Sequence, residues 1–81
     1  MAKYEIKDGV GIIPEGTTYI VSCAFENCKE LKSVVIPNSV KTIGSQAFAG
    51  CTGLSGKLVI PDNVEVINYL AFEDCSNLTE L

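Results

Sequence analysis

An internal repeat of 23 to 24 residues constrains the fold of this chain more than any other feature. The dipeptide Ile-Pro starts at residues 13, 36 and 60, so the two steps are 23 and 24 residues long. Four further sets of positions keep these steps: the Ala-Phe pairs that start at residues 24, 47 and 71; Cys28, Cys51 and Cys75; Leu31, Leu54 and Leu78; and Ile20, Ile43 and Ile67. A repeat of this length predicts stacked units that bury their apolar sides against one another.

The second step is longer because one additional residue separates Leu54 from Ile60, compared with the segment from Leu31 to Ile36. We expect the Ser55-Gly56 pair to absorb this residue in a turn, because serine and glycine are common turn residues.

The repeat also divides the chain, which at 81 residues is the size of a single domain. Residues 1–12 precede the first unit, residues 13–35 and 36–59 form two units, and residues 60–81 form an incomplete third. Residues 78–81 match the start of a new unit and end within its expected strand, which favours a fragment excised from a longer solenoid.

Composition and charge argue against several classes of function. The chain has six lysines, no arginine and ten acidic residues, which gives a formal net charge of −4. Nucleic acids and acidic membrane surfaces need clustered basic side chains, so we expect neither as a partner. The apolar runs are too short to span a bilayer, and the N-terminal residues lack the apolar stretch of a signal peptide, so we expect no membrane insertion.

Each unit predicts the same succession of short elements. Tyr4 and Ile6 alternate with polar residues before the turn signal Asp8-Gly9, so residues 1–12 predict a hairpin that covers the N-terminal end. In the middle unit, Val34 and Ile36 alternate with polar or exposed positions, which predicts a short strand with these two residues facing the core.

The second half of each unit predicts a further extended segment and then a helical turn. Val40 and Ile43 face the core from the opposite side, and Ser45 is placed to cap a helical turn over residues 46–49. Asn27, Gly50 and Asp74 follow these turns, and such residues tolerate a left-handed backbone. Phe25, Phe48 and Phe72 are then expected to stack as a column through the core.

The cysteines are the residues that most resemble a site of chemistry. Cys28, Cys51 and Cys75 recur once per unit, so they form a line of thiols about 4.8 Å apart rather than a set of ligands around one point. With no histidine in the chain, we expect no metal and no cofactor. Cysteines of neighbouring units are close enough for one disulfide. Cys23 and Cys28 of the first unit are another possible pair, so the sequence leaves the redox state of the four cysteines open.

The repeat resembles a known family. The pattern Cys-x-x-Leu-x-x-Val-x-Ile-Pro-x-x-Val-x-x-Ile-x-x-x-Ala-Phe is similar to that of the BspA-like leucine-rich repeats, and residues 51–72 follow it apart from the additional residue. The resemblance covers residues 13–81, with departures at residues 16–19 and at Cys23. It implies an α/β, right-handed leucine-rich-repeat solenoid with short parallel strands on the concave face, and with extended segments and single helical turns on the convex side. It also implies microbial proteins of the cell surface that serve in adhesion or partner binding.

We therefore expect a non-catalytic module that binds a protein partner through the outward side of the concave strands. Six residues are predicted to line that side: Ile12, Ser33, Val35, Lys57, Val59 and Glu80. Ile12, Val35 and Val59 share one register and form an apolar stripe, which is a signal of interaction, although β-branched residues favour strands in any case.

Two other functions were considered, an enzyme and a structural spacer. Without histidine, the cysteines and serines have no evident activating base, and the carboxylates show no pairing, so we do not expect an enzyme. The alternative to a binding module is a structural spacer that assembles with itself, because an uncovered C-terminal end would leave an unpaired strand and apolar side chains for a homo-oligomer.

Overall fold

The computed structural model describes residues 2–80 and, within them, every side chain except those of Lys57 and Glu80. Eight short strands are present in this part of the chain: β1 (Glu5–Lys7), β2 (Val10–Ile12), β3 (Tyr19–Ile20), β4 (Ser33–Val34), β5 (Thr42–Ile43), β6 (Gly56–Lys57), β7 (Val66–Ile67) and β8 (Leu78–Glu80).

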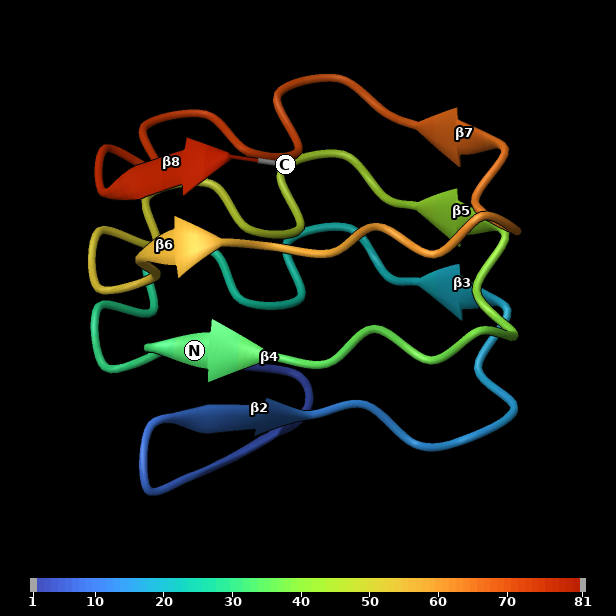
Figure 1. Cartoon of the computed structure of the whole chain (residues 1–81), viewed down its shortest axis with the longest axis horizontal. Helices are drawn as coiled ribbons and strands as arrows, with labels where there is room; N and C mark the ends of the chain where they lie inside the picture. Colours follow the sequence, from blue (N-terminus) through green and yellow to red (C-terminus); the bar gives the residue numbers. More distant parts are fainter. Residues whose placement is uncertain (1, 81) are drawn as a thin grey trace.

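The strands stack in two columns on opposite sides of a repeat solenoid (Figure 1). We call the column of β2, β4, β6 and β8 the first wall, and the column of β3, β5 and β7 the second wall. Residues 22–27, 45–50 and 69–74 form turns that join the second wall back to the first, and we call them the turn wall. The stack confirms the expected solenoid and the expected second extended segment of each unit.

Parallel pairing connects successive units. β3, β5 and β7 form one three-stranded sheet, in which Ile20 lies opposite Ile43 and Ile43 lies opposite Ile67. On the first wall β2 pairs with β4, and β6 pairs with β8, both in parallel. The repeat period therefore equals one turn of the solenoid.

The N-terminal segment forms the predicted hairpin. β1 pairs with β2 in antiparallel fashion, and both turn residues, Asp8 and Gly9, have positive φ. The segment before β1 lies against the first unit: the backbone N–H of Lys3 donates to the carbonyl of Ala24 at 2.8 Å, and the ring of Tyr4 lies 5.7 Å from the ring of Phe25. This geometry supports a capping role, which remains a prediction.

The predicted helical turns are wrong, and with them the α/β class. Within residues 2–80 the structure contains no helix. Gln46 and Asn27 both have φ near 59°, in the left-handed region. Backbone N–H groups in the turn wall alternate between partners: that of Ala47 donates within its unit to Gly44, whereas that of Phe48 donates to Ala71 of the next unit. Since every second donor points to a neighbouring unit, a continuous helix cannot form.

The predicted left-handed position after each turn is confirmed, because Asn27, Gly50 and Asp74 all have positive φ. A second left-handed position near the start of each turn was not foreseen from the sequence. It is occupied by Cys23, Gln46 and Leu70, whose residue types give no sign of it.

The core is the predicted column of phenylalanines with aliphatic residues on either side. Phe25 and Phe48 are fully buried, and their ring centroids lie 5.5 Å apart. Phe48 stacks in turn on Phe72, which is half-buried at the C-terminal end of the stack. Val34, Ile36, Val40 and Ile43 are buried as predicted.

The additional residue near the end of the second unit lies in a strand rather than in the predicted turn. Gly56 belongs to β6, has positive φ, and sits at a register shift in the pairing of β6 with β8. The first wall is consequently split into two sheets, since β4 and β6 belong to different ones. The second wall stays continuous, because the additional residue lies on the first-wall side of the repeat, in the segment of β6.

Candidate protein-binding site

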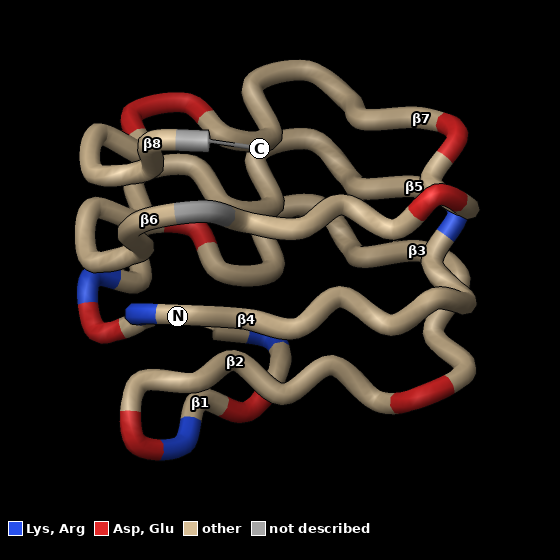
Figure 2. Tube along the Cα trace, viewed as in Figure 1, with Lys and Arg blue, Asp and Glu red and all other residues tan. Residues whose placement is uncertain are grey.

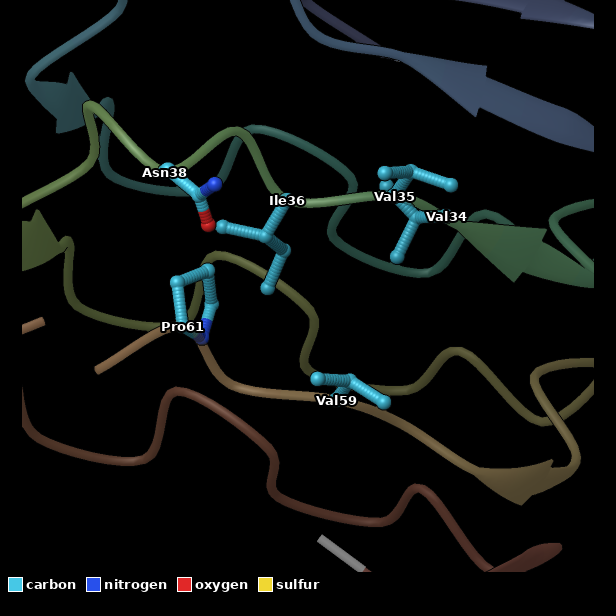
Figure 3. A pocket seen from close by; sticks show the side chains of 6 residues that line it. All are labelled: Val34, Val35, Ile36, Asn38, Val59 and Pro61. Atoms are coloured by element: carbon cyan, nitrogen blue, oxygen red, sulfur yellow. The ribbon is translucent and has the colours of Figure 1, made fainter. Parts of the chain in front are cut away.

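An apolar hollow opens on the first wall where its sheet is split. Its volume is about 360 Å³, and its lining residues are Val34, Val35, Ile36, Asn38, Val59 and Pro61. In Figure 3 Val34, the last residue of β4, and the next three residues of this set lie on one segment, and Val59 and Pro61 lie across from them on the segment that follows β6.

Alternation along the extended chain builds this surface. Val34 and Ile36 point into the core and are buried, whereas Val35 between them is 75% exposed. One unit further on, Leu58 is buried and Val59 is 66% exposed. Each of these two segments therefore contributes one valine that projects from the wall.

The hollow exists because the two units are not joined by strand pairing at this point. At the N-terminal end of the first wall, β2 and β4 are joined by a parallel ladder in which Val10 lies opposite Ser33 and Gly11 lies opposite Val34. β6, which contains the insertion at Gly56, pairs with β8 in a shifted register and does not pair with β4. The departure from the strict repeat thus coincides with the break in the first wall.

The hollow is uncharged. Five of its six lining residues are valine, isoleucine or proline, and the sixth is Asn38, whose backbone carbonyl accepts a hydrogen bond of 2.8 Å from the side-chain amide of Asn63. None of the six lining residues is charged, and Figure 2 shows the acidic and basic residues of the described part mainly on the loops at either side of the stack. Such a surface suits an apolar side chain of a partner.

The six residues that the sequence predicted as the binding surface lie in different places. Val35 and Val59 line the hollow, while Ile12 and Ser33 are exposed on the same wall outside it. The side chains of Lys57 and Glu80 lie outside the described part of the structure. Ile12 follows Gly11, which pairs with Val34, so Ile12 continues the row of Val35 as predicted.

The sequence prediction missed the other contributors to the hollow. Ile36 was predicted only to face the core, and Pro61 was considered only as part of the recurring Ile-Pro pairs that set the period. Neither residue carries a signal of its own in the sequence: Ile36 is far from the additional residue between Leu54 and Ile60, and the position of Pro61 just after it does not by itself indicate a surface.

In the cysteine column Cys28 and Cys51 are buried and Cys75 is half-buried, and their thiols donate hydrogen bonds to the backbone. All four cysteines are free thiols; the Sγ of Cys51 donates to the carbonyl of Phe25 and the Sγ of Cys75 donates to the carbonyl of Phe48, both at 3.0 Å. Burial, with a smaller contribution from the neighbouring Cys75, raises the pKa of Cys51 to about 12. Burial also raises the pKa of Cys28 and of Cys75.

These thiols are therefore protonated near neutral pH and poor nucleophiles, since the thiolate is the reactive form. Among residues 2–80 no cluster of three cysteines or acidic residues has the geometry to hold a metal ion. The same part of the chain contains no helix of the length and apolarity that crossing a membrane requires.

Stacked units of a short strand, a second short strand and a turn, with a repeated aromatic and leucine core, define a solenoid of the leucine-rich-repeat class. The sequence matches the family described as "BspA type Leucine rich repeat region (6 copies)" over residues 10–81. The chain therefore belongs to the BspA-type leucine-rich-repeat family, as its repeated motif predicted. No curated protein and no solved structure matches it.

Proposed function

We propose that this protein is a non-catalytic interaction module that binds a protein partner through its first wall, with Val35 and Val59 at the centre of the contact. The observation that carries the proposal is the hollow between the two valines, both of which are largely exposed. Leucine-rich repeats generally mediate protein interactions, which supports the same function.

The physical argument is one of apolar burial. An exposed valine gains about 1.5 to 3 kcal/mol when it is fully buried, so two of them beside a preformed hollow are a favourable place for an apolar anchor. Isoleucine and proline in the lining are already fixed by the core, so little ordering entropy is lost on binding. We further propose a place on the microbial cell surface or outside the cell, as is common for BspA-type repeats, with adhesion as the biological role.

The site can be tested without knowing the natural partner. A library of displayed random peptides is selected against the protein, and the enriched peptides are titrated into isotope-labelled protein while amide and methyl spectra are recorded. We expect apolar anchor residues in the peptides and changes at Val34, Val35, Ile36 and Val59. Changes confined to the second wall or to the turn wall would refute the assignment of the site.

A second candidate function is structural, namely self-assembly through the C-terminal end. The specific observation is that Val66, Ile67 and Tyr69 are exposed there, next to the half-buried Phe72. Sedimentation at tens of micromolar tests it: a dimer or larger species that Val66→Lys dissociates is expected, and a monomer would count against it.

A further inference from the structure

The hollow of the first wall ends at a corner that is built in the same way in all three units. After each Ile-Pro pair the chain turns, and the backbone N–H three residues after the proline donates to the proline carbonyl: Thr17 to Pro14 at 3.2 Å, Val40 to Pro37 at 3.1 Å and Val64 to Pro61 at 3.1 Å. The residues directly after the prolines are Glu15, Asn38 and Asp62, and all three are exposed. Since the three turns share one hydrogen bond, these side chains leave the corner from equivalent positions.

Side-chain hydrogen bonds hold the corners of neighbouring units against one another. The Oγ of Ser39 donates to the carbonyl of Thr17, and the side-chain amide of Asn63 donates to the carbonyl of Asn38, both at 2.8 Å. The corners therefore stack in the same order as the units. The residues directly after the prolines form a column in which the asparagine lies between two carboxylates, and we call this set, residues 15, 38 and 62, the corner column.

The corner column borders the hollow. Asn38 is itself a lining residue, and Figure 3 shows its carboxamide at the end of the hollow beside Ile36. Asp62 directly follows Pro61, which lines the same end from the next unit. Glu15 occupies the equivalent position of the preceding unit, on the other side of Asn38. The apolar hollow therefore ends at a polar amide with a negative charge on each side.

Two lysines flank the same segments and leave this charge in place. Lys32 precedes β4, and its side-chain carbons lie over Gly9 in the hairpin turn, where a Cβ would meet them at 3.2 Å. Lys41 lies after the corner, and its carbonyl accepts from the backbone N–H of Glu65 at 2.8 Å, so an acidic residue of the next unit stands beside it. Among the described side chains the end of the hollow is therefore acidic, as is the chain as a whole, with a net charge of −4.

We propose that the partner segment bound at the hollow carries an apolar side chain and, two residues away, a lysine or arginine that meets the corner column. The inference rests on the function proposed for the hollow and adds the chemistry of the partner. In an extended chain, side chains two residues apart face the same side and lie about 7 Å apart. The apolar stem of a lysine or arginine can then lie along the lining of the hollow while its charged head reaches the carboxylates.

The two parts of this surface have different tasks. Burial of the apolar side chain supplies most of the binding energy, because ion pairs between exposed groups contribute little. The carboxylates instead select among apolar segments: they attract a basic one and repel an acidic one, which gives specificity and faster association.

The test selects displayed peptides with one fixed leucine flanked by random residues, in parallel against the wild-type chain and against Glu15→Gln/Asp62→Asn. The corner accepts asparagine, because Asn38 already occupies the equivalent position. We expect lysine and arginine to be enriched two positions from the leucine with the wild type and not with the variant. Glu73→Gln/Asp74→Asn, on the turn wall, changes the net charge equally and is the matched control, which should keep the enrichment.

An enriched peptide is then titrated into each protein. We expect Glu15→Gln/Asp62→Asn to bind it about fivefold more weakly than the wild type, and the control variant to bind it equally well. Moving the basic residue to the position next to the leucine, where it faces the other side, should weaken binding by a similar factor. Salt at about 0.5 M should remove most of the difference, because it screens exposed charges.

The outcomes separate this inference from the function on which it rests. Peptides that bind at Val35 and Val59 without any preference for a basic residue would overturn the inference and leave the binding function standing. Loss of the preference in the control variant would also overturn it, since net charge alone would then explain the selection. Signals of the two valines that move with protein concentration alone would make a second copy the occupant, and the absence of binding at these valines would overturn both proposals.

Discussion

The rings of Phe48 and Phe72 are stacked with their planes 1° apart and their centroids separated by 5.2 Å, although 24 residues separate them in the chain. Phe25 continues the stack on the other side of Phe48. Phe48 therefore has another phenylalanine ring stacked on each of its two faces, whereas Phe25 and Phe72 have one on a single face.

This difference predicts unequal costs of truncation. Phe48→Ala should lower the free energy of unfolding by about 3 to 5 kcal/mol, because it leaves a large cavity in a closed core. Phe72→Ala, at a half-buried position, should cost less, about 1 to 3 kcal/mol. Urea unfolding monitored by circular dichroism measures both, and a Phe48→Ala variant as stable as Phe72→Ala would show that the column is not the main core.

The contact of Tyr4 with Phe25 predicts that the hairpin segment stabilises the first unit. Tyr4→Ala should lower the free energy of unfolding by about 1 to 2 kcal/mol, through lost burial and the lost aromatic contact. Tyr69→Ala is the matched control, since Tyr69 is 76% exposed and its removal should change stability little. Equal effects of the two substitutions would argue against a capping role for Tyr4.

The left-handed backbone of Gln46 predicts tolerance of glycine at this position. A side chain at such a φ costs about 1 to 2 kcal/mol, and glycine has no such penalty, so Gln46→Gly should leave stability unchanged or raise it by up to about 1 kcal/mol. Ala49→Gly, without positive φ, should destabilise. If residues 46–49 formed a helical turn, both substitutions would destabilise the protein by about 1 kcal/mol. Thermal unfolding of the two variants therefore distinguishes the left-handed position at Gln46 from a helical turn.

The buried thiol of Cys51 predicts a loss of stability at alkaline pH. Its pKa rises from 9.0 to about 12 in the folded protein, so the unfolded chain loses this proton first as the pH increases. The contribution of the neutral thiol is therefore full below pH 9 and declines between pH 9 and about 12.

Other groups titrate in the same range, so the comparison is with Cys51→Ala. The difference in urea midpoint between wild type and variant should be constant at neutral pH and shrink above pH 9. A difference that stays constant up to pH 11 would contradict the role assigned to burial of this thiol.

The sequence was sufficient to predict what the repeat itself specifies. Positions such as Phe48 and Ile43 recur in every unit and see the same surroundings, so their burial follows from the period alone. The turn at Asp8-Gly9 was predictable for a similar reason, because its residue types suit a tight hairpin. Both the repeated positions and the residue types of a tight turn can be recognised in a single sequence.

The predictions from the sequence were wrong or incomplete where the conformation of a residue depends on a neighbouring unit. Gln46 is left-handed because its backbone must present alternate donors to the next unit, and nothing in its side chain signals this. The hollow likewise results from how the insertion at Gly56 shifts strand pairing, so Ile36 and Pro61 could not be recognised as surface. Val35 and Val59 were found because alternation in a short strand needs only local sequence.

The central claim is that the two exposed valines and the hollow between them bind a partner, and the most direct measurement is the affinity of a selected peptide for the Val35→Lys/Val59→Lys variant. The account predicts binding about tenfold weaker or worse, since lysine would have to lose its water at an apolar contact, with thermal unfolding close to that of the wild type. The control Val66→Lys, on the second wall, should bind as the wild type does. Unchanged affinity in the folded double variant would contradict the account.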